Sequence, residues 1–178
     1  MSGGSKETSF RIETAEEKDW PWIVQGEAEI VWVRLDHERQ QETSQQAIEE
    51  RVAQRVAKLR KDEGFPNEAF IARTDEGARA GFVWVAKTHN DSTGQLEASL
   101  LSQYVAEPCR GRGLGHRLME TAEDWARRQG LPRISLSVGA HNTLGQMLYE
   151  SLGYQVETLR MTKKLSPRAP DELLLGTE

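Results

Sequence analysis

The first third of the chain places its apolar residues in patterns that predict one strand followed by two helices. Residues 9–14 alternate apolar and polar side chains, which is the period of a half-buried strand. Asp19 and Pro21 then mark a helix start, because both residue types are favoured there. Residues 43–62 carry an apolar stripe among charges, which predicts a second helix. This stripe consists of Ala47, Ile48, Val52, Val56 and Leu59.

Three strands are predicted in the middle of the chain. Residues 68–73 and 81–87 are rich in Phe, Ile, Val and Trp and flank a turn-forming segment, so we expect a hairpin. A third strand is predicted over residues 96–106. Leu96, Ala98 and Leu100 occupy even positions, whereas Leu101 and Val105 occupy odd positions. Such a change of face predicts a β-bulge.

The last third predicts a helix, a strand, a second helix and a final strand. Helical periodicity begins at Leu114 and Gly130 supplies its stop. A strand is expected over residues 134–138. Asn142 can cap the next helix, and residues 155–164 predict a last strand.

Length and composition favour one globular domain. The chain has 178 residues, of which 37% are hydrophobic and 29% charged. We assign residues 9–165 to a single domain, residues 1–8 to a flexible N-terminus and residues 166–178 to a C-terminal tail. The sequence has no apolar run near the roughly 20 residues of a membrane span and no secretory signal. We therefore expect a cytoplasmic protein that does not enter a membrane.

The cysteine and histidine content and the net charge of the chain indicate which disulfides, metals and nucleic-acid partners to expect. The single Cys109 excludes an internal disulfide framework and a cysteine-based metal site, and the 4 histidines are scattered. We therefore expect no metal. The net charge of -5 and the pI near 5.5 disfavour a nucleic-acid binder, which normally carries a basic face.

The stretch CRGRGLGHRLME places glycines and arginines directly before a predicted helix. Unpaired N–H groups at a helix start favour anions, and glycines at 111, 113 and 115 let oxygen atoms approach the backbone. Arg110 and Arg112 can add positive charge. The dinucleotide pattern GxGxxG fails because His116 stands where its last glycine would be, and the chain has no P-loop motif. A plain helix cap is the alternative to a phosphate site.

Two segments together resemble the GNAT superfamily, the acetyl-CoA-dependent N-acetyltransferases. QYVAEPCRGRGLGHRLM is similar to the pyrophosphate-binding motif of that family, and LSVGAHNTLGQMLYESLGYQ is similar to its later motif. In the later motif an Asn precedes a Tyr by seven positions and a Gly-aromatic pair follows. Asn142, Tyr149, Gly153 and Tyr154 match this pattern. With the opening FRIETAEEKDWPWI included, the resemblance covers residues 10–164.

The resemblance implies a fold, a co-substrate and a binding site. The expected fold is α/β (α+β), with a mixed, mainly antiparallel central sheet flanked by helices and splayed between the strand ending near Ala106 and the strand over 133–138. Acetyl-CoA would be the co-substrate. Its pyrophosphate would meet backbone N–H groups of the glycine turn, and its pantetheine would lie along the preceding strand. The implied binding residues are Gln103, Tyr104, Val105, Arg110, Gly111, Arg112, Gly113, Leu114, Gly115, His116 and Asn142.

The resemblance also implies transfer of an acetyl group to a primary amine of a small molecule or a polypeptide. Tyr149 matches the family position of the general acid that protonates the leaving thiolate. Packing on an apolar helix stripe is the alternative role for Tyr149. Glu97 is a weak candidate for the general base, since an isolated Glu is more often only solvated. Ser137 replaces an acidic residue that is common in members acting on ribosomal protein N-termini, so that substrate is disfavoured.

Several alternatives remain open at this point. The protein can be a non-catalytic CoA-binding sensor or interaction module, or a nucleotide-phosphate binder. The aromatic residues of the first helix can line an acceptor pocket beside acidic residues or pack in the core, and core packing is favoured. These residues are Trp20, Trp22 and Trp32, with Glu27, Glu29 and Asp36. A homodimer is among the assemblies that the sequence allows.

Overall fold

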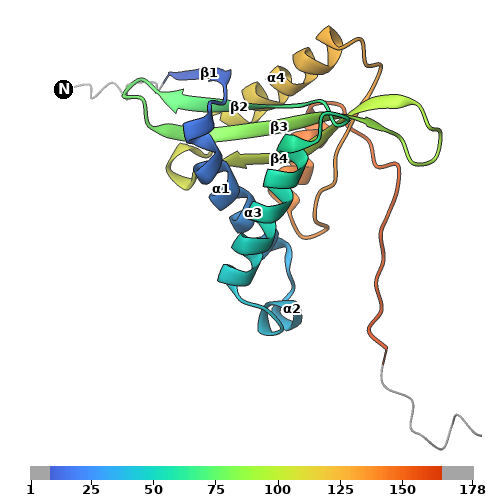
Figure 1. Ribbon diagram of the computed structural model, residues 1–178. Helices are drawn as coiled ribbons and strands as arrows, with labels where there is room; N and C mark the ends of the chain where they lie inside the picture. Colours follow the sequence, from blue (N-terminus) through green and yellow to red (C-terminus); the bar gives the residue numbers. More distant parts are fainter. Residues whose placement is uncertain (1–8, 166–178) are drawn as a thin grey trace, which may run out of the picture.

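The computed structural model describes residues 9–165, so the predicted segments 1–8 and 166–178 lie outside the described residues. The described part contains a five-stranded sheet in the order β1-β2-β3-β4-β5 (Figure 1). Its strands are β1 (Phe10–Thr14), β2 (Asn67–Thr74), β3 (Arg79–His89), β4 (Leu96–Val105) and β5 (Ile134–Ser135). Strands β1 to β4 are antiparallel neighbours, whereas β5 pairs with β4 in parallel. The predicted mixed, mainly antiparallel sheet is therefore confirmed.

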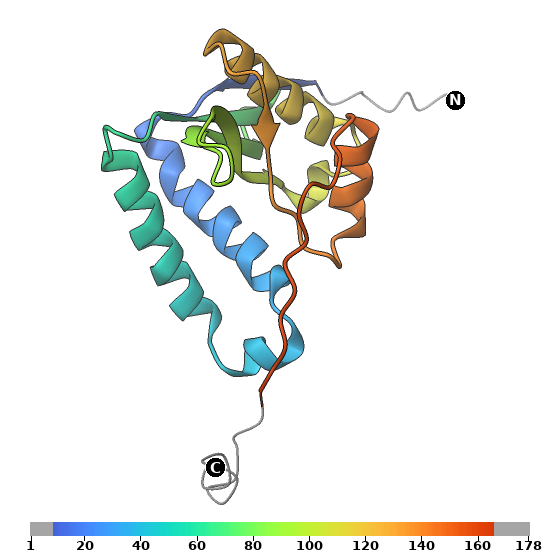
Figure 2. The same ribbon diagram turned by 90° about the vertical axis from the view of Figure 1, so that its right-hand side faces the viewer.

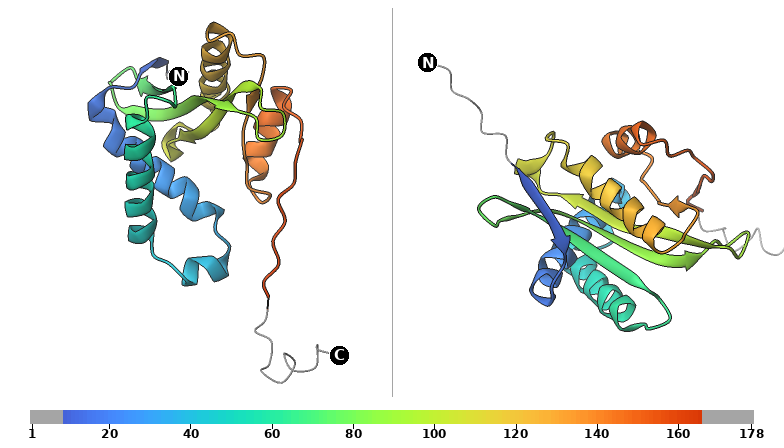
Figure 3. Two further views of the ribbon diagram at one scale, coloured as in Figure 1. Left: turned by 45° about the vertical axis from the view of Figure 1, so that its right-hand side comes forward. Right: turned by 90° about the horizontal axis from the view of Figure 1, so that it is seen from above.

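Helices cover both faces of the sheet. The longer ones are α1 (Trp20–Arg34), α3 (Gln45–Lys61) and α4 (Leu114–Arg128), and the shorter ones are α2 (His37–Gln41) and α5 (Thr143–Ser151). Helices α1 and α3 lie on one face and α4 lies on the other (Figures 1 and 3). The sequence pattern did not predict α2, which begins where the Asp36 carboxylate accepts a hydrogen bond from the Arg39 N–H at 2.9 Å.

Each face of the sheet has its own apolar core. Val83 of β3 and Leu118 of α4 are fully buried in the core between the sheet and α4. Phe82, the neighbour of Val83, points to the opposite face and is buried with Ile23 of α1 and Val52 of α3. Because successive side chains of a strand point to opposite faces, β3 contributes to both cores. The central strands are therefore packed on both faces.

The predicted β-bulge lies in β4. Trp84 of β3 is opposite Ser102, but the next residue, Val85, is opposite Leu100. Leu101 is therefore the extra residue, and the apolar positions of β4 change face at the point where the sequence pattern changes. This prediction is confirmed.

Of the two strands predicted near the C-terminus, the first is shorter than predicted and the second is absent from the described residues. Strand β5 ends at Ser135 rather than at residue 138, and residues 155–165 form no regular secondary structure. Leu159 and Met161 in that segment are 83% and 90% exposed. The local alternation of apolar residues indicated strand propensity, but a strand also needs a neighbour to pair with, and β5 pairs with β4 only at Ala98–Ile134 and Ser99–Ser135. The splay between β4 and β5 stays a prediction.

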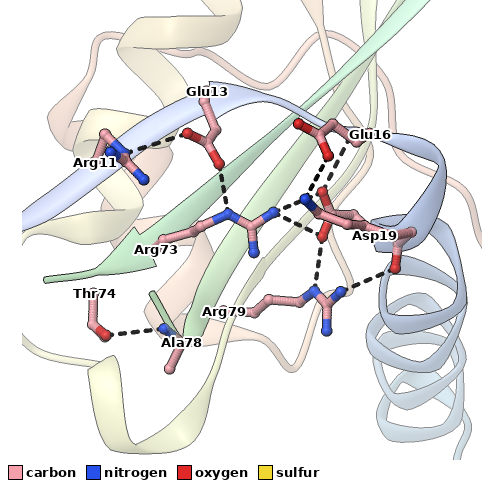
Figure 4. A network of polar contacts seen from close by, with 9 residues as sticks. Arg11, Glu13, Glu16, Asp19, Arg73, Thr74, Ala78 and Arg79 are labelled. Atoms are coloured by element: carbon pink, nitrogen blue, oxygen red, sulfur yellow. Dashed lines mark hydrogen bonds and ion pairs between the residues drawn. The ribbon is translucent and has the colours of Figure 1, made fainter. Parts of the chain in front are cut away.

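A buried carboxylate fixes the start of α1 to the β2–β3 hairpin (Figure 4). Asp19 is fully buried, and its oxygens accept two hydrogen bonds of 2.9 Å from Arg73 and one of 2.8 Å from Arg79. The Glu16 N–H donates to the same carboxylate at 3.1 Å, and Glu13 pairs with Arg73 from β1. Charged hydrogen bonds of this kind compensate for the lost hydration of a buried carboxylate.

We expect Asp19→Asn to lower the free energy of unfolding by about 3 to 5 kcal/mol, because it leaves two arginines without their shared counter-charge. For a chain of this size the melting temperature should fall by roughly 10 °C. Chemical denaturation of both proteins measures the difference. Asp75→Asn provides a matched control, because Asp75 is exposed in the hairpin turn and its loss should cost less than about 0.5 kcal/mol. Equal stability of the two variants would contradict the role of Asp19 as the anchor that ties the start of α1 to Arg73 and Arg79.

The pH dependence of this stabilisation follows from the pKa of Asp19. Burial opposes ionisation most strongly, but hydrogen bonds from Arg79, the Glu16 N–H and Arg73 together lower the pKa of this carboxyl below its ordinary value. The stabilisation is therefore complete above the unfolded pKa of about 3.9 and is lost as pH falls through the lower folded pKa. The stability gap between wild type and Asp19→Asn should stay constant from pH 8 to 5 and narrow only below about pH 4.

Candidate active site

The glycine turn opens α4, as the sequence predicts. It follows β4 and a short 3-10 helix (Glu107–Cys109) and leads directly into the helix at Leu114. Gly111 and Gly113 have φ values of 72° and 73°, the left-handed region that favours glycine. A Cβ atom at either position would meet no other atom within 4 Å. The backbone of the turn is therefore open to the outside at the helix start, where the first N–H groups lack intrahelical partners.

The third glycine of the motif has a different role. Gly115 lies inside α4, and a Cβ atom there would be 3.2 Å from Leu148 Cδ2 of α5. The next residue of α4, His116, lies within hydrogen-bond distance of Ser151, the last residue of α5, with 3.0 Å between His116 Nε2 and Ser151 Oγ. These contacts fix the start of α4 against α5, which carries Tyr149.

Gln103 joins Tyr149 to the glycine turn. The Tyr149 hydroxyl donates to Gln103 Oε1 at 3.1 Å, and Gln103 Nε2 donates to the Gly115 carbonyl oxygen at 2.7 Å. The Tyr149 ring packs against the core beneath α4 and contacts the edge of Tyr154, with 5.9 Å between ring centroids. The ring of Tyr149 is therefore a packing element, and its hydroxyl is a polar group at the predicted site. No sequence pattern indicates these side-chain contacts of Gln103.

The electrostatic surroundings keep Tyr149 protonated. Burial raises the pKa of its phenol, and the positive charge of Arg34 opposes this effect only in part. At neutral pH the hydroxyl is therefore a proton donor. This state is the one that a general acid needs.

Tyr104 lies on the opposite face of β4 and contacts α1. Its hydroxyl donates to Glu29 Oε2 at 2.7 Å, and its ring stacks with Phe82 at 5.7 Å between centroids. Burial, followed by the hydrogen bond to Glu29, raises the pKa of Tyr104 to about 12. Helix α1 approaches this closely because Gly26 faces the ring, and a Cβ atom at Gly26 would be 3.1 Å from Tyr104.

The first arginine of the motif has partners within the protein. Arg110 Nε donates to the Val105 carbonyl oxygen at 2.9 Å, and its guanidinium lies 3.5 Å from Glu29 Oε1. Arg110 thus links the turn to both β4 and α1. Arg112 is exposed on the turn. Asn142 caps α5 as predicted, because its Oδ1 accepts the Gly145 N–H at 3.0 Å.

The structure does not bring Glu97 to Tyr149. Glu97 is buried near the start of β4, where Ser135 Oγ donates to it at 2.9 Å and Asn90 Nδ2 at 3.2 Å. Gln103, the partner of Tyr149, lies six residues further along the same strand, a distance of roughly 20 Å in an extended chain. Glu97 therefore stabilises the contact between β4 and β5, and its role as the general base stays a prediction.

The tryptophans of α1 take part in packing. Trp20 contacts the edge of Trp84 at 5.4 Å between centroids and has the Arg60 guanidinium 4.1 Å above its ring. Trp22 contacts Phe82 and Tyr104 in the same edge-on manner. This agrees with the core interpretation of these aromatic residues. The neighbouring carboxylates are also engaged: Glu27 is buried and pairs with Arg55, Glu29 accepts from Tyr104, and Asp36 caps α2.

Between residues 9 and 165 no helix is both long and apolar enough to cross a membrane. Within the same range no three His, Cys, Asp or Glu side chains come together in a way that could hold a metal ion.

Comparison with known proteins places this site in a family. A family model described as Acetyltransferase (GNAT) family matches residues 17–154. An uncharacterized N-acetyltransferase of Bacillus subtilis, YdgE, is 35% identical over 91 residues, which cover 51% of this chain and 57% of the relative. A mycothiol acetyltransferase of Nocardiopsis dassonvillei is 29% identical over 158 residues, which cover 83% of this chain and 46% of the relative. The matched segments thus span about half of the length of these curated relatives.

Solved structures give the same result for the fold. A putative acetyl transferase from Pyrococcus furiosus superposes with a TM-score of 0.73 and 25% identity, and the match covers 88% of this chain and 100% of that chain. The family model covers the sheet from β2 to β5, the glycine turn and Tyr149. The chain therefore belongs to the acetyltransferase (GNAT) family, whose co-substrate is acetyl-CoA.

Proposed function

We propose that the protein is an N-acetyltransferase that moves an acetyl group from acetyl-CoA to a primary amine of a small molecule or a polypeptide. The observation that carries this proposal is the connection of Tyr149 to the glycine turn through Gln103. A proton donor and an open phosphate-binding backbone, separated by 34 residues along the chain between Gly115 and Tyr149, meet at one end of β4. In acetyl-CoA the pantetheine joins the pyrophosphate to the thioester, so the proton donor and the phosphate-binding backbone must lie no further apart than the length of the pantetheine.

The chain offers a place for each part of the co-substrate. The open backbone at Gly111 and Gly113, beside the start of α4, suits the pyrophosphate. Strand β5 pairs with β4 only at Ala98 and Ser99, so the β5 side of the later residues of β4 has no strand partner in the described chain. Main-chain groups of Gln103, Tyr104 and Val105 can there bind the pantetheine amides, and Asn142 stands at the start of α5.

The reaction that these groups support is direct transfer. The neutral amine attacks the thioester carbonyl, the carbon–nitrogen bond forms, and the carbon–sulfur bond breaks. Tyr149 gives its proton to the departing sulfur, while the nitrogen loses one proton to water. The products are the acetylated amine and CoA with a free thiol. A general acid of this kind typically contributes about a hundredfold or more in rate.

The acceptor class follows less directly from the site. Two relatives whose matches cover 83% and 84% of this chain are named mycothiol acetyltransferases, which favours a small-molecule acceptor. The net charge of -5 suits a cationic amine. A cytoplasmic location and a homodimer stay predictions.

The decisive experiment follows release of free thiol from acetyl-CoA with a panel of small-molecule and peptide amines. We expect turnover with at least one class. Stabilisation by CoA in a thermal melt without turnover of any amine would favour a non-catalytic CoA-binding module. Stronger stabilisation by ATP or NAD than by CoA would favour a nucleotide-phosphate binder.

A further inference from the structure

The Gln103 amide has only one favourable orientation between its two partners. The Gly115 carbonyl oxygen can only accept a hydrogen bond, so the Gln103 NH₂ group must face it at 2.7 Å. The amide oxygen must then face Tyr149, whose hydroxyl lies 3.1 Å away. An amide oxygen cannot donate, and therefore the Tyr149 hydroxyl must point its proton at Gln103. The backbone of the glycine turn thus sets the direction of the Tyr149 O–H bond.

We propose that Gln103 is a positioning residue that keeps Tyr149 protonated before the reaction and fixes its hydroxyl relative to the start of α4. The inference rests on the proposed function, because it assumes that Tyr149 is the general acid. An acceptor beside a phenol stabilises the protonated form and disfavours the phenolate. To protonate the thiolate, the Tyr149 hydroxyl turns about its C–O bond, so that its proton leaves Gln103 and moves to the sulfur. The phenolate oxygen that remains faces the oxygen of Gln103, and this repulsion favours recovery of a proton from water.

The same bridge couples the position of Tyr149 to that of the turn. Gly115 belongs to the first turn of α4, and Leu148 of α5 lies against it. The Tyr149 hydroxyl has no other hydrogen bond in the described chain, so Gln103 is its sole polar guide there. Loss of the Gln103 amide should therefore affect the chemical step more than CoA binding.

The test is a double-mutant cycle on kcat with Gln103→Met and Tyr149→Phe, using the best amine from the panel. Met has nearly the length of Gln but no strong acceptor or donor. We expect Gln103→Met alone to lower kcat about tenfold, with the Kd for CoA changed less than about twofold. In the Tyr149→Phe background the same change should lower kcat less than about twofold further.

The outcomes separate this inference from the proposed function. If Tyr149→Phe lowers kcat and Gln103→Met causes the same additional loss in both backgrounds, the positioning role is wrong and the acid stands. If Tyr149→Phe leaves kcat unchanged while amines are still acetylated, Tyr149 is not the acid and the inference falls with it. Gln146→Met is a matched control, because Gln146 also caps backbone carbonyls, those of Gly139 and Ala140, at 3.0 Å. Its effect should be equal in both backgrounds.

A pH profile distinguishes positioning from general damage to the fold. Removing the acceptor in Gln103→Met should lower the pKa of Tyr149 and move the alkaline limb of kcat to lower pH. Gln103→Glu keeps an acceptor and adds negative charge, so the limb should move to higher pH or out of range. Structural damage would not produce shifts of opposite sign. A profile that is the same in both variants overturns the proposal.

Discussion

A Gly113→Asp variant is expected to lose almost all thermal stabilisation by CoA. In the wild type, CoA at a hundred times its Kd should stabilise the fold by about 2.7 kcal/mol. A Cβ atom at Gly113 meets no protein atom within 4 Å, so the new side chain would project into the space offered to the pyrophosphate. The carboxylate would fill this space and repel the phosphates. Melting curves with and without CoA provide the measurement.

Gly113→Asn distinguishes the effect of a negative charge at residue 113 on CoA binding from the effects of side-chain volume and backbone strain. Asn has nearly the shape of Asp and tolerates the left-handed backbone at this position, where φ is 73°. We expect this variant to keep part of the CoA effect, and both variants to melt at similar temperatures without ligand. Equal protection of the Asp variant and the wild type would contradict a phosphate site at this turn.

A Tyr149→Phe variant should lower kcat about a hundredfold or more, while the affinity for CoA changes little. The substitution keeps the ring that packs beneath α4 and removes only the hydroxyl. A hundredfold loss corresponds to about 2.7 kcal/mol of barrier. Steady-state thiol release and CoA binding are measured on each variant. Because burial raises the pKa of this phenol, the wild type should not lose activity through Tyr149 ionisation at neutral pH.

The opposite result has a specific meaning for Tyr149. An unchanged kcat would reduce the residue to its packing role, which the contacts of its ring already establish. A fall in both kcat and CoA affinity would indicate that the helix has moved. In that case the loss of kcat and of CoA affinity would come from a changed contact between Gly115 and Leu148 and not from the missing hydroxyl.

Local features of the site could be predicted from the sequence because each depends on residues close together in the chain. Positive φ angles need glycine, so the turn before α4 was evident. A change in the face of apolar residues marked the bulge at Leu101. The cap at Asn142 likewise depends on a hydrogen bond that reaches only three residues ahead.

Features that depend on distant partners were missed or misjudged. Gln103 and Tyr149 are 46 positions apart, and nothing in either local pattern indicates their hydrogen bond. The position of Glu97 relative to the site likewise depends on how far β4 extends past its bulge. Residues 155–164 show the reverse error, since a strand-like pattern was present but no described strand pairs with it.

The anchor at Asp19 gives α1 one fixed end and one lightly held end. Its start is tied by charged hydrogen bonds to Arg73 and Arg79. Its far end is tethered through exposed contacts, such as Arg34 to the Ser137 carbonyl at 3.4 Å. For protein engineering, the segment over residues 33–44 is thus the natural place for exchange. Replacing it with corresponding segments of related acetyltransferases should leave the sheet, the glycine turn and Tyr149 in their places.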